Sequence, residues 1–317
     1  MMPAQGRARG LVVMALAVGT LSSGTTIVKW GDTEGTIVAF WRLLAATAAW
    51  WIVLIVRRSR RGVPFPSRAT WRTMLPAGLF FGADISVIFI AVSKTSIAHA
   101  EFISSLTPLI VVPIGAALFH ERPNPRALPF AAVAIAGLAL VLGAGGNSSG
   151  TSLQGDAMVV VAVCLWAGYL LCSRMARATV GVVDFMATVV PLGLIVVVPA
   201  VAIRTHGDLW PPDGRAWGSI FLLTIVTGML GHCFIAIAQR LIDVGTISVI
   251  GVAQPAIAVC WARVVLGEPI KATQIPGMAV LLAGLIGFTL LQQRLRPVVT
   301  AITECDADLV PEPAAGP

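Results

Sequence analysis

Residues 108–138 read PLIVVPIGAALFHERPNPRALPFAAVAIAGL, and residues 255–285 read PAIAVCWARVVLGEPIKATQIPGMAVLLAGL. A shift of 147 residues lays the first segment on the second without a gap, and ten of the 31 positions are then identical. The identities include the leading proline, one glutamate and the ending Ala-Gly-Leu. This agreement is above chance even for apolar sequence, so the chain is predicted to contain two copies of one unit.

The composition predicts what kind of unit is repeated. Of the 317 residues, 57% are hydrophobic and only 12% are charged, which is too little polar surface for a soluble protein of this length. Apolar stretches long enough to cross a bilayer recur along the chain. We count ten, near 10–29, 36–56, 73–93, 96–119, 127–144, 156–173, 182–202, 216–239, 245–266 and 274–292. Each must satisfy its own backbone hydrogen bonds in lipid, so the expected fold is an all-α integral membrane protein with ten transmembrane helices.

The repeat and the charges predict the topology. Each copy holds five spans, an odd number, so the second copy must cross the membrane in the opposite direction, as in the inverted repeats of secondary transporters. With the N-terminus inside, 15 of the 22 Lys and Arg residues lie on the inner side and 6 on the outer side, so both termini are predicted to be cytoplasmic. The expected division is a first repeat at 1–144, a linker at 145–154, a second repeat at 155–293 and a disordered cytoplasmic tail at 294–317.

Four stretches carry a resemblance to a known family. They are FWRLLAA at 40–46, SLTPLIVVPIGAALFHERP at 105–123, GDAMVVVAVCLWAGYLLCSR at 155–174 and AQPAIAVCWARVVLGEPI at 253–270. Their order and spacing resemble the EamA family of the drug/metabolite transporter superfamily, over about residues 10–292. The resemblance implies a carrier that moves small metabolites or drugs across the plasma (inner) membrane without hydrolysing nucleotide. The family's first helix usually holds a Trp-Gly pair, whereas this chain reads TLSSGTT at 20–26, a departure that concerns the solute pocket.

Glu101 is the first candidate for chemistry. On a helix it shares one polar stripe with Ser104, Ser105 and Pro108, at spacings of three, four and seven residues. An ionised glutamate within lipid costs about 3 kcal/mol, so this side chain should face the interior, pair with a cation or be protonated. We keep two roles open, a proton-coupled transport role and a structural pair with Arg42. His99, on another face and nearer the helix end, is expected at the membrane interface.

Asp84 and His232 form a second candidate set. The 147-residue shift places Asp84 opposite Gly231, so the two ionisable residues occupy nearly equivalent places in the two copies. An Asp–His pair could relay a proton or bind an amine or carboxylate, or it could be an interhelical hydrogen bond without a transport role.

The remaining candidates are polar, aromatic or helix-breaking residues within spans. Packing and solute contact both remain open for them, and they are Ser22, Ser23, Thr25, Trp166, Tyr169, Gln254 and Pro255. Pro108 and Pro255 should kink their helices and line the central path. Glu121 and Glu268, at helix ends, are expected to be structural and to need a cation from Arg122, Arg126 or Lys271. Gly137, Gly143, Gly277 and Gly284 suit packing and a homodimer contact through the fifth and tenth spans.

These observations favour a secondary transporter of a small solute, with export as the expected direction, over a membrane-embedded enzyme or a passive scaffold. No zinc-protease motif, nucleophile elbow or phosphate-binding loop occurs, and no cofactor or metal is predicted. The net charge of +7 is distributed between apolar runs as in a membrane protein, so the expected partners are the solute and the lipid bilayer and not nucleic acid. The five cysteines have no metal-site spacing, and the four that lie within apolar runs are expected to pack within helices.

Overall fold

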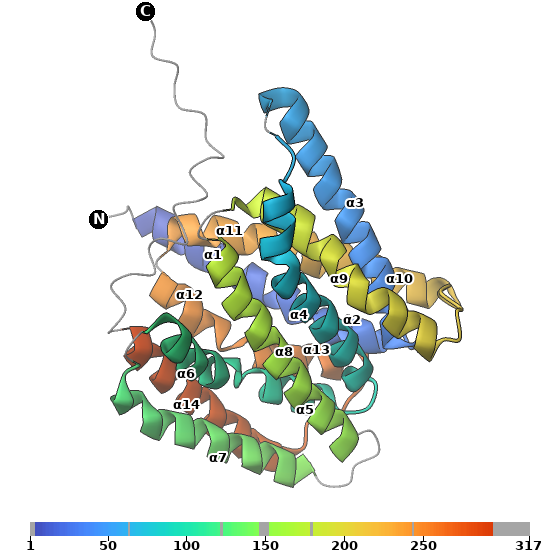
Figure 1. Cartoon of the computed structure of the whole chain (residues 1–317). Helices are drawn as coiled ribbons and strands as arrows, with labels where there is room; N and C mark the ends of the chain where they lie inside the picture. The colour runs from blue at the N-terminus through green and yellow to red at the C-terminus, as the bar shows by residue number, and fades with distance from the viewer. Residues whose placement is uncertain are drawn as a thin grey trace, which may run out of the picture.

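Helices account for all the regular secondary structure of the residues that the computed structural model describes, which are 4–62, 64–120, 123–145, 152–177, 180–242 and 244–293. Ten stretches are long and apolar enough to cross a membrane, and their bounds follow the expected spans closely (Figure 1). The α-helices are α1 Ala4–Leu21, α2 Gly24–Trp30, α3 Gly35–Arg61, α4 Arg68–Val92, α5 Ile97–Ser104, α6 Thr107–Phe119, α7 Leu128–Gly145, α8 Leu153–Arg177, α9 Val182–Arg204, α10 Gly214–Leu222, α11 His232–Leu241, α12 Val244–Gly251, α13 Gln254–Val265 and α14 Ile275–Gln293. A π-helical segment, η2 (Leu223–Gly231), joins α10 to α11, and short 3-10 turns, η1 (Pro125–Ala127) and η3 (Ala272–Gln274), precede α7 and α14.

Three spans are interrupted. The first is split into α1 and α2 at Ser22–Ser23, the fourth into α5 and α6 at Ser105–Leu106, and the ninth into α12 and α13 at Val252–Ala253. The expected interruption of the helices at the prolines is seen, since Pro108 and Pro255 lie in the first turn of α6 and α13, where a residue without an N–H is tolerated. That these prolines line a central path stays a prediction. The break in the first span has no proline. There the hydroxyls of Ser22 and Ser23 donate to the carbonyls of Gly19 and Thr20 at 3.1 and 2.7 Å, and such bonds compete with the helical pattern.

The internal repeat is visible in the helices themselves. α5, α6, η1 and α7 begin at residues 97, 107, 125 and 128, and α12, α13, η3 and α14 begin at 244, 254, 272 and 275. Each start differs from its counterpart by the 147 residues found in the sequence. The two copies therefore share the positions of their helix breaks and turns, in addition to the identical residues.

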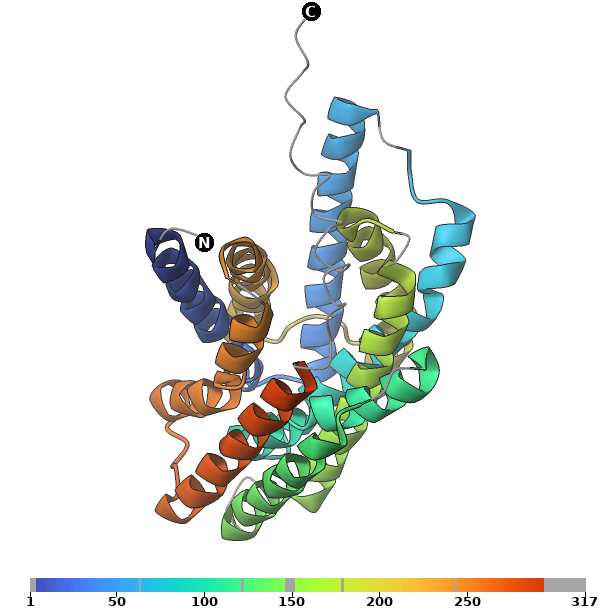
Figure 2. The ribbon, with the colours of Figure 1, turned by 90° about the vertical axis from the view of Figure 1, so that its left-hand side faces the viewer.

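α7 and α14 lie side by side and antiparallel (Figures 1 and 2). A Cβ added at Gly137 would come 2.3 Å from the backbone nitrogen of Leu281, and one added at Gly284 would come 2.5 Å from that of Ala134. The 147-residue shift exchanges these two contacts, so they are symmetry mates within the chain. The glycine faces expected to serve a homodimer are thus covered within one chain, because only glycine lets these two helices approach so closely. Gly143 is different, since a Cβ there would have no atom within 4 Å.

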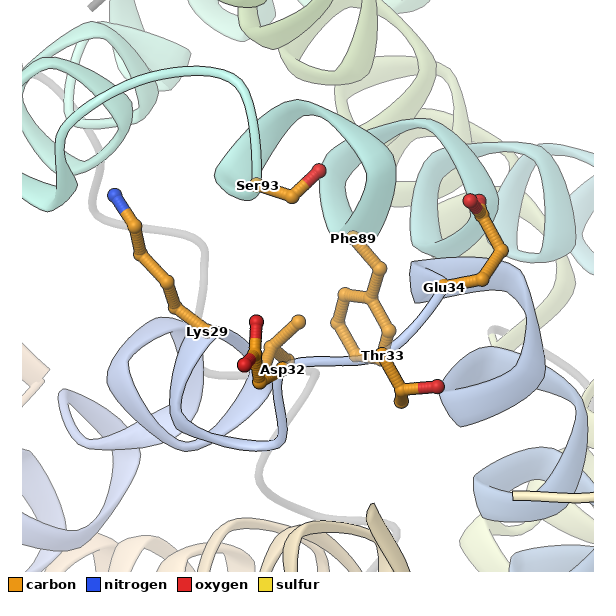
Figure 3. A pocket seen from close by; sticks show the side chains of 7 residues that line it. Lys29, Asp32, Thr33, Glu34, Phe89 and Ser93 are labelled. Carbon is orange, nitrogen blue, oxygen red and sulfur yellow. The ribbon is translucent and has the colours of Figure 1, made fainter. Parts of the chain in front are cut away.

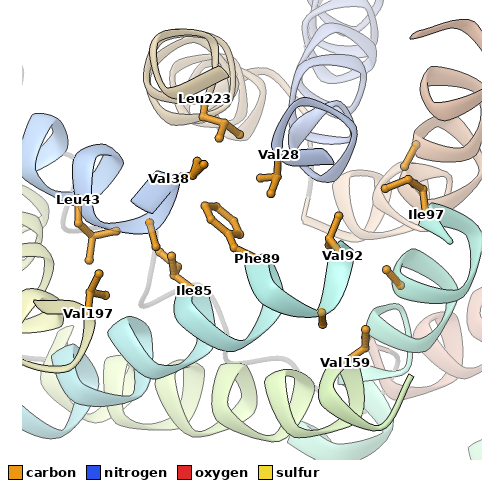
Figure 4. Packing of buried hydrophobic residues seen from close by; sticks show 14 of the residues in the cluster. Val28, Val38, Leu43, Ile85, Phe89, Val92, Ile97, Val159, Val197 and Leu223 are labelled. Atoms are coloured by element: carbon orange, nitrogen blue, oxygen red, sulfur yellow. The ribbon is translucent and has the colours of Figure 1, made fainter. Parts of the chain in front are cut away.

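The largest buried apolar cluster lies between α2, α3, α4, α5, α8 and α9, and it also includes residues of α10, η2 and α13 (Figure 4). Phe89 and Val92 of α4 lie near its middle, facing Val28 of α2 and Val38 of α3. α1 packs away from this cluster, against α11 (Figure 2). The loops 31–34, 93–96, 205–213 and 266–271 gather at one end of the bundle, which we call the Lys29 end. At the other end α3 continues beyond the expected 56 to Arg61, and Gly62, with a φ of 66°, ends it.

Parts of two sequence expectations fall outside the described residues. The tail 294–317 lies wholly outside them and the linker 145–154 lies partly outside them.

Candidate functional site

Glu101 and Thr25 meet inside the bundle. Thr25, on α2, donates a hydrogen bond from its hydroxyl to Glu101 Oε1 on α5 at 2.7 Å. Both helices belong to interrupted spans, and Glu101 lies four residues before the break at Ser105. The structure therefore brings together two of the residues that the sequence singled out, from the first and fourth spans.

Glu101 has a neutral partner, whereas three other carboxylates of the bundle have basic neighbours; Asp184, in the first turn of α9, has none among the described residues. Asp84 interacts with the charge of Arg42, Glu268 with Lys29, and Asp156 with His99. Within the described part of the chain no cationic side chain pairs with Glu101. An ionised carboxylate at this depth needs a counter-charge, so Glu101 is the interior group best placed to bind a proton or a cation that is not part of the protein.

One turn from Thr25 on α2, Lys29 bridges the two repeats. Its Nζ lies 2.6 Å from Oε1 of Glu268, which follows α13, and it donates to the carbonyl oxygen of Thr95 at 2.7 Å. Glu268 Oε2 in turn accepts a bond at 3.1 Å from the backbone N–H of Ile97, in the first turn of α5. We call the Lys29–Glu268 pair the outer latch, after the side of the membrane on which the charge distribution of the sequence predicts Lys29 to lie. The cation expected for Glu268 was Lys271, and the cation found is Lys29.

Because Lys29 and Thr25 are four residues apart on one helix, they lie on the same face of α2. That face makes two polar contacts at successive depths, Thr25 with Glu101 and Lys29 with Glu268. α2 also packs against α13, α10 and η2 of the second repeat. Any separation of α2 from α5 and α13 at this end must break both contacts.

His99 does not have the interfacial environment expected for it. Its side chain is only 3% exposed, and its Nδ1 lies 2.9 Å from Oδ2 and 3.2 Å from Oδ1 of Asp156, in the first turn of α8. Thr95 donates to the same carboxylate at 2.5 Å. The prediction was wrong because the histidine lies near the end of its span but under α8, and a single span cannot show which helix will cover it.

Asp84 is 8% exposed on α4 and interacts with the charge of Arg42 on α3. The guanidinium of Arg42 also lies 5.5 Å from the ring centroid of Phe89. The structural pair considered for Arg42 was with Glu101, but the acidic group that its charge meets is Asp84. The side chain of His232 is outside the described residues, so the Asp84–His232 pair stays a prediction.

The aromatic pair of α8 belongs to a packed cluster. The rings of Trp166 and Tyr169 have centroids 4.8 Å apart, and Tyr169 also lies 5.1 Å from Phe81 and 6.5 Å from Phe185. Tyr169 is 8% exposed and packs with residues of α4 and α9. Of the two roles left open for this pair, the packing role is the one that the geometry displays.

The remaining candidates surround the helix breaks. Ser22 and Ser23 are buried at the break in the first span, and Ser104 and Ser105 lie at the break in the fourth, where the Ser105 hydroxyl donates to Phe102 O at 2.7 Å. Gln254 and Pro255 open α13, which packs against α2 and α5. Trp261 of α13 donates from its indole to the carbonyl of Gly19 at 2.9 Å, close to the break in the first span.

The cysteines are more exposed than the sequence suggested. Cys164, Cys233 and Cys260 are free thiols on the exposed surface of the helices and not packing residues, since they lie on outward-facing sides that a linear pattern did not separate from interior ones. Cys305 lies outside the described residues, as does Glu121.

The sequence did not single out Lys29, Thr95 or Asp156, whose contacts join the helices at the Lys29 end. One signal was present, because Lys29 follows Thr25 at a spacing of four residues within an apolar span. Its partner could not be found in this way, since Glu268 is 239 positions away and in the other repeat.

Comparison with known proteins agrees with this architecture. The model of the EamA-like transporter family matches residues 8–143 and 153–290, one match for each repeat. The chain belongs to the EamA-like transporter family. It is accordingly a multi-pass plasma-membrane protein that transports small solutes, and it is not an enzyme.

Two relatives and one solved structure show how far the similarity extends. The threonine/homoserine exporter RhtA of Salmonella typhimurium is 23% identical over 292 residues, which cover 90% of this chain and 92% of RhtA. An uncharacterized transporter of Bacillus subtilis, YxxF, is 23% identical over 229 residues, or 72% of each chain. A crystal structure with 20% sequence identity covers 92% of this chain and 99% of its own with a TM-score of 0.61, which supports the fold.

Proposed function

We propose that this transporter exports a small solute bearing an ammonium group in exchange for protons, with Glu101 as the group that binds each in turn. The observation that carries the proposal is the Glu101 carboxylate, which is hydrogen-bonded to neutral Thr25 and has no cationic partner among the described residues. The placement beside interrupted helices supports it, because transporters commonly bind solutes where helices are discontinuous.

The exchange follows from the chemistry of a single carboxylate. Protonated Glu101 carries no charge and gives an ammonium group no ion pair, whereas ionised Glu101 needs a counter-charge at this depth. One site can therefore hold a proton or an ammonium group but not both. A carrier that changes sides only when this site is neutralised would move one proton inward for each solute that it moves outward.

Asp84 is the alternative carboxylate, and the contacts favour Glu101. Asp84 is 8% exposed and already meets the positive charge of Arg42. That charge would repel a solute cation that approached Asp84. We assign the Asp84–Arg42 pair to holding α3 against α4.

The proposed alternation is between two arrangements of inverted repeats, 1–144 and 155–293, with the Lys29 end outside and both termini in the cytoplasm. The antiparallel, symmetry-related contacts of α7 and α14 support the inversion. The outer latch and the Thr25–Glu101 bond both tie α2 to its neighbours at the Lys29 end. They would keep that end closed while solute enters from the cytoplasm, and they would break as solute leaves.

The identity of the solute is suggested by one relative. RhtA is named for the export of threonine and homoserine, and both carry an ammonium group, a carboxylate and a hydroxyl. We propose a small amino acid of this kind as the solute. The polar residues at the break in the first span, Ser22, Ser23 and Thr25, would suit its hydroxyl and carboxylate.

Currents from proteoliposomes on coated sensors test this proposal. A panel of amino acids, nucleosides, amines and cationic drugs would be applied with and without an imposed proton gradient. We expect currents for small amino acids that grow with the gradient and vanish in Glu101→Gln, while Asp156→Glu, a control that keeps its charge, retains them. Gradient-independent currents, or full activity in Glu101→Gln, would contradict the proposal.

A further inference from the structure

A polar pocket opens at the Lys29 end, beside the outer latch. Its volume is about 340 Å³. α2 and the loop after it contribute Val28, Lys29, Asp32 and Thr33, and α4 contributes Phe89 and Ser93 (Figure 3). This volume lies at the lower end of the range of small-molecule sites.

The two carboxylates in the pocket wall, Glu34 and Asp32, differ in how accessible they are to a ligand. Glu34, also in its wall, is held by Arg204 through two bonds of 3.0 and 3.1 Å. Asp32 is 81% exposed, and its cationic neighbour, Arg215, lies 3.8 Å away. Figure 3 shows the Asp32 carboxylate directed toward the space below α4. Asp32 is therefore the wall carboxylate that an incoming ammonium group can reach.

The other wall residues suit the rest of a small zwitterion. The ammonium group of Lys29 has three N–H donors, of which one bonds the carbonyl oxygen of Thr95, and the group also forms the ion pair with Glu268. Figure 3 shows the Thr33 hydroxyl and the Phe89 ring on the side of Asp32 that is opposite Lys29, where the edge of this largely buried ring lines the pocket. A carboxylate at Lys29 and an ammonium group at Asp32 would match these walls.

We propose that this pocket is a second, low-affinity solute site that takes a small zwitterionic amino acid at the outer face. The proposal rests on the proposed function, since it places a site for departing solute one helical turn beyond Thr25 on the same helix. Exposed ion pairs contribute little to binding, so a dissociation constant in the millimolar range or weaker is expected. Weak binding is suited to a place from which solute must leave.

The backbone allows a clean test at Asp32. Its φ of 49° is left-handed, a conformation that asparagine tolerates well, so Asp32→Asn removes the charge without backbone strain. Ser93, at the end of α4, is exposed and can be replaced by cysteine as a reporter in a chain whose five native cysteines are changed to serine. Thr33→Cys is the second reporter, and Ala272→Cys, exposed at the same end but outside the pocket, is the control reporter.

The measurement is the rate at which a membrane-impermeant maleimide labels each reporter in proteoliposomes. L-Threonine added outside should slow labelling of Ser93→Cys with half-protection at millimolar concentration and leave Ala272→Cys unchanged. 1-Amino-2-propanol and 3-hydroxybutyrate, which each lack one of its charged groups, should protect only at higher concentration. Asp32→Asn should raise the half-protecting concentration of threonine about fivefold, as expected for one exposed charge contact.

The proposal is overturned if threonine protects neither reporter, if it protects Ala272→Cys equally, or if Asp32→Asn has no effect. Glu101→Gln separates the two claims, because it should abolish gradient-driven transport and leave this protection intact. Protection that persists while Glu101→Gln transports normally would refute the proposed function alone, and protection lost in Glu101→Gln would refute the independent outer site.

Discussion

Replacing Lys29 by methionine should open the Lys29 end. Methionine keeps an apolar stem of similar length and removes the charge. The substitution eliminates the interactions of Nζ with Glu268 at 2.6 Å and with the carbonyl of Thr95 at 2.7 Å. Hydrogen bonds to charged groups contribute about 1.5–3 kcal/mol each. The two side chains are 24% and 22% exposed, so water screens part of this, and we take about 2 kcal/mol as the net loss.

If these interactions exist only while the end is closed, about 2 kcal/mol corresponds to an increase of about 30-fold in the open fraction. Thr26 is 1% exposed on α2 and its hydroxyl has no partner among the described residues, so Thr26→Cys is a conservative reporter beneath the latch. In a cysteine-free chain, its reaction with an impermeant thiol reagent from outside should accelerate by about the same factor when Lys29→Met is added.

Lys94→Met is the matched control. Lys94 lies at the same end, and its ammonium group bonds the exposed side chain of Gln154 at 3.3 Å, so its replacement should change the labelling rate less than about twofold, the effect of a surface pair. A labelling rate that is the same in Lys29→Met and in Lys94→Met would refute the view that the Lys29–Glu268 pair closes this end.

Three further outcomes are expected. Gly137→Ala should lower the free energy of unfolding by about 1–3 kcal/mol, because the new Cβ would meet the Leu281 backbone at 2.3 Å, whereas Gly143→Ala should leave it unchanged. Thermal unfolding in detergent compares the two variants. Equal effects would contradict the close approach of α7 and α14. Asp156→Asn should cost about 1–3 kcal/mol by weakening the acceptor of buried His99, and an unchanged unfolding midpoint would show that the pair is not stabilising. Thr25→Val should reduce kcat/KM for export about tenfold, whereas Thr25→Ser should keep the wild-type value because serine retains the hydroxyl that donates to Glu101. Full activity in the valine variant would exclude a role for that bond.

The fold could be predicted from sequence because its signals are local or periodic. Spans are recognisable by their length and hydropathy, and the prolines at 108 and 255 mark helix breaks because a missing N–H acts within one turn. The 147-residue shift found in the sequence also separates the starts of α12, α13 and α14 from those of α5, α6 and α7. The break at Ser22–Ser23 was not foreseen, since it depends on hydroxyls that bond to the preceding turn and not on a residue that forbids a helix.

The contacts between spans could be predicted only in part. Glu101 and Thr25 were both selected because polar groups are costly in lipid. The hydrogen bond between them was not predicted, because the sequence does not show that α2 and α5 are neighbours. Lys29 with Glu268 and His99 with Asp156 show the same limit. In each pair the sequence shows a charged or titratable residue within a span, but its partner lies in a distant segment and could not be identified. The glycines of α7 and α14 showed that a close approach was needed, and left open whether the partner helix lay in the same chain.

The central claim is that Glu101 binds the proton and the solute ammonium group in turn, and one experiment tests it most directly. Proteoliposomes would be loaded with labelled threonine, and its movement would be followed with a proton gradient and, separately, in equal-pH exchange for unlabelled threonine. Wild type should respond to the gradient, and Glu101→Gln, which cannot ionise, should lose that response, while the matched Asp84→Asn variant shows whether any buried carboxylate has the same effect. A proton gradient that drives threonine equally well through Glu101→Gln would contradict the account.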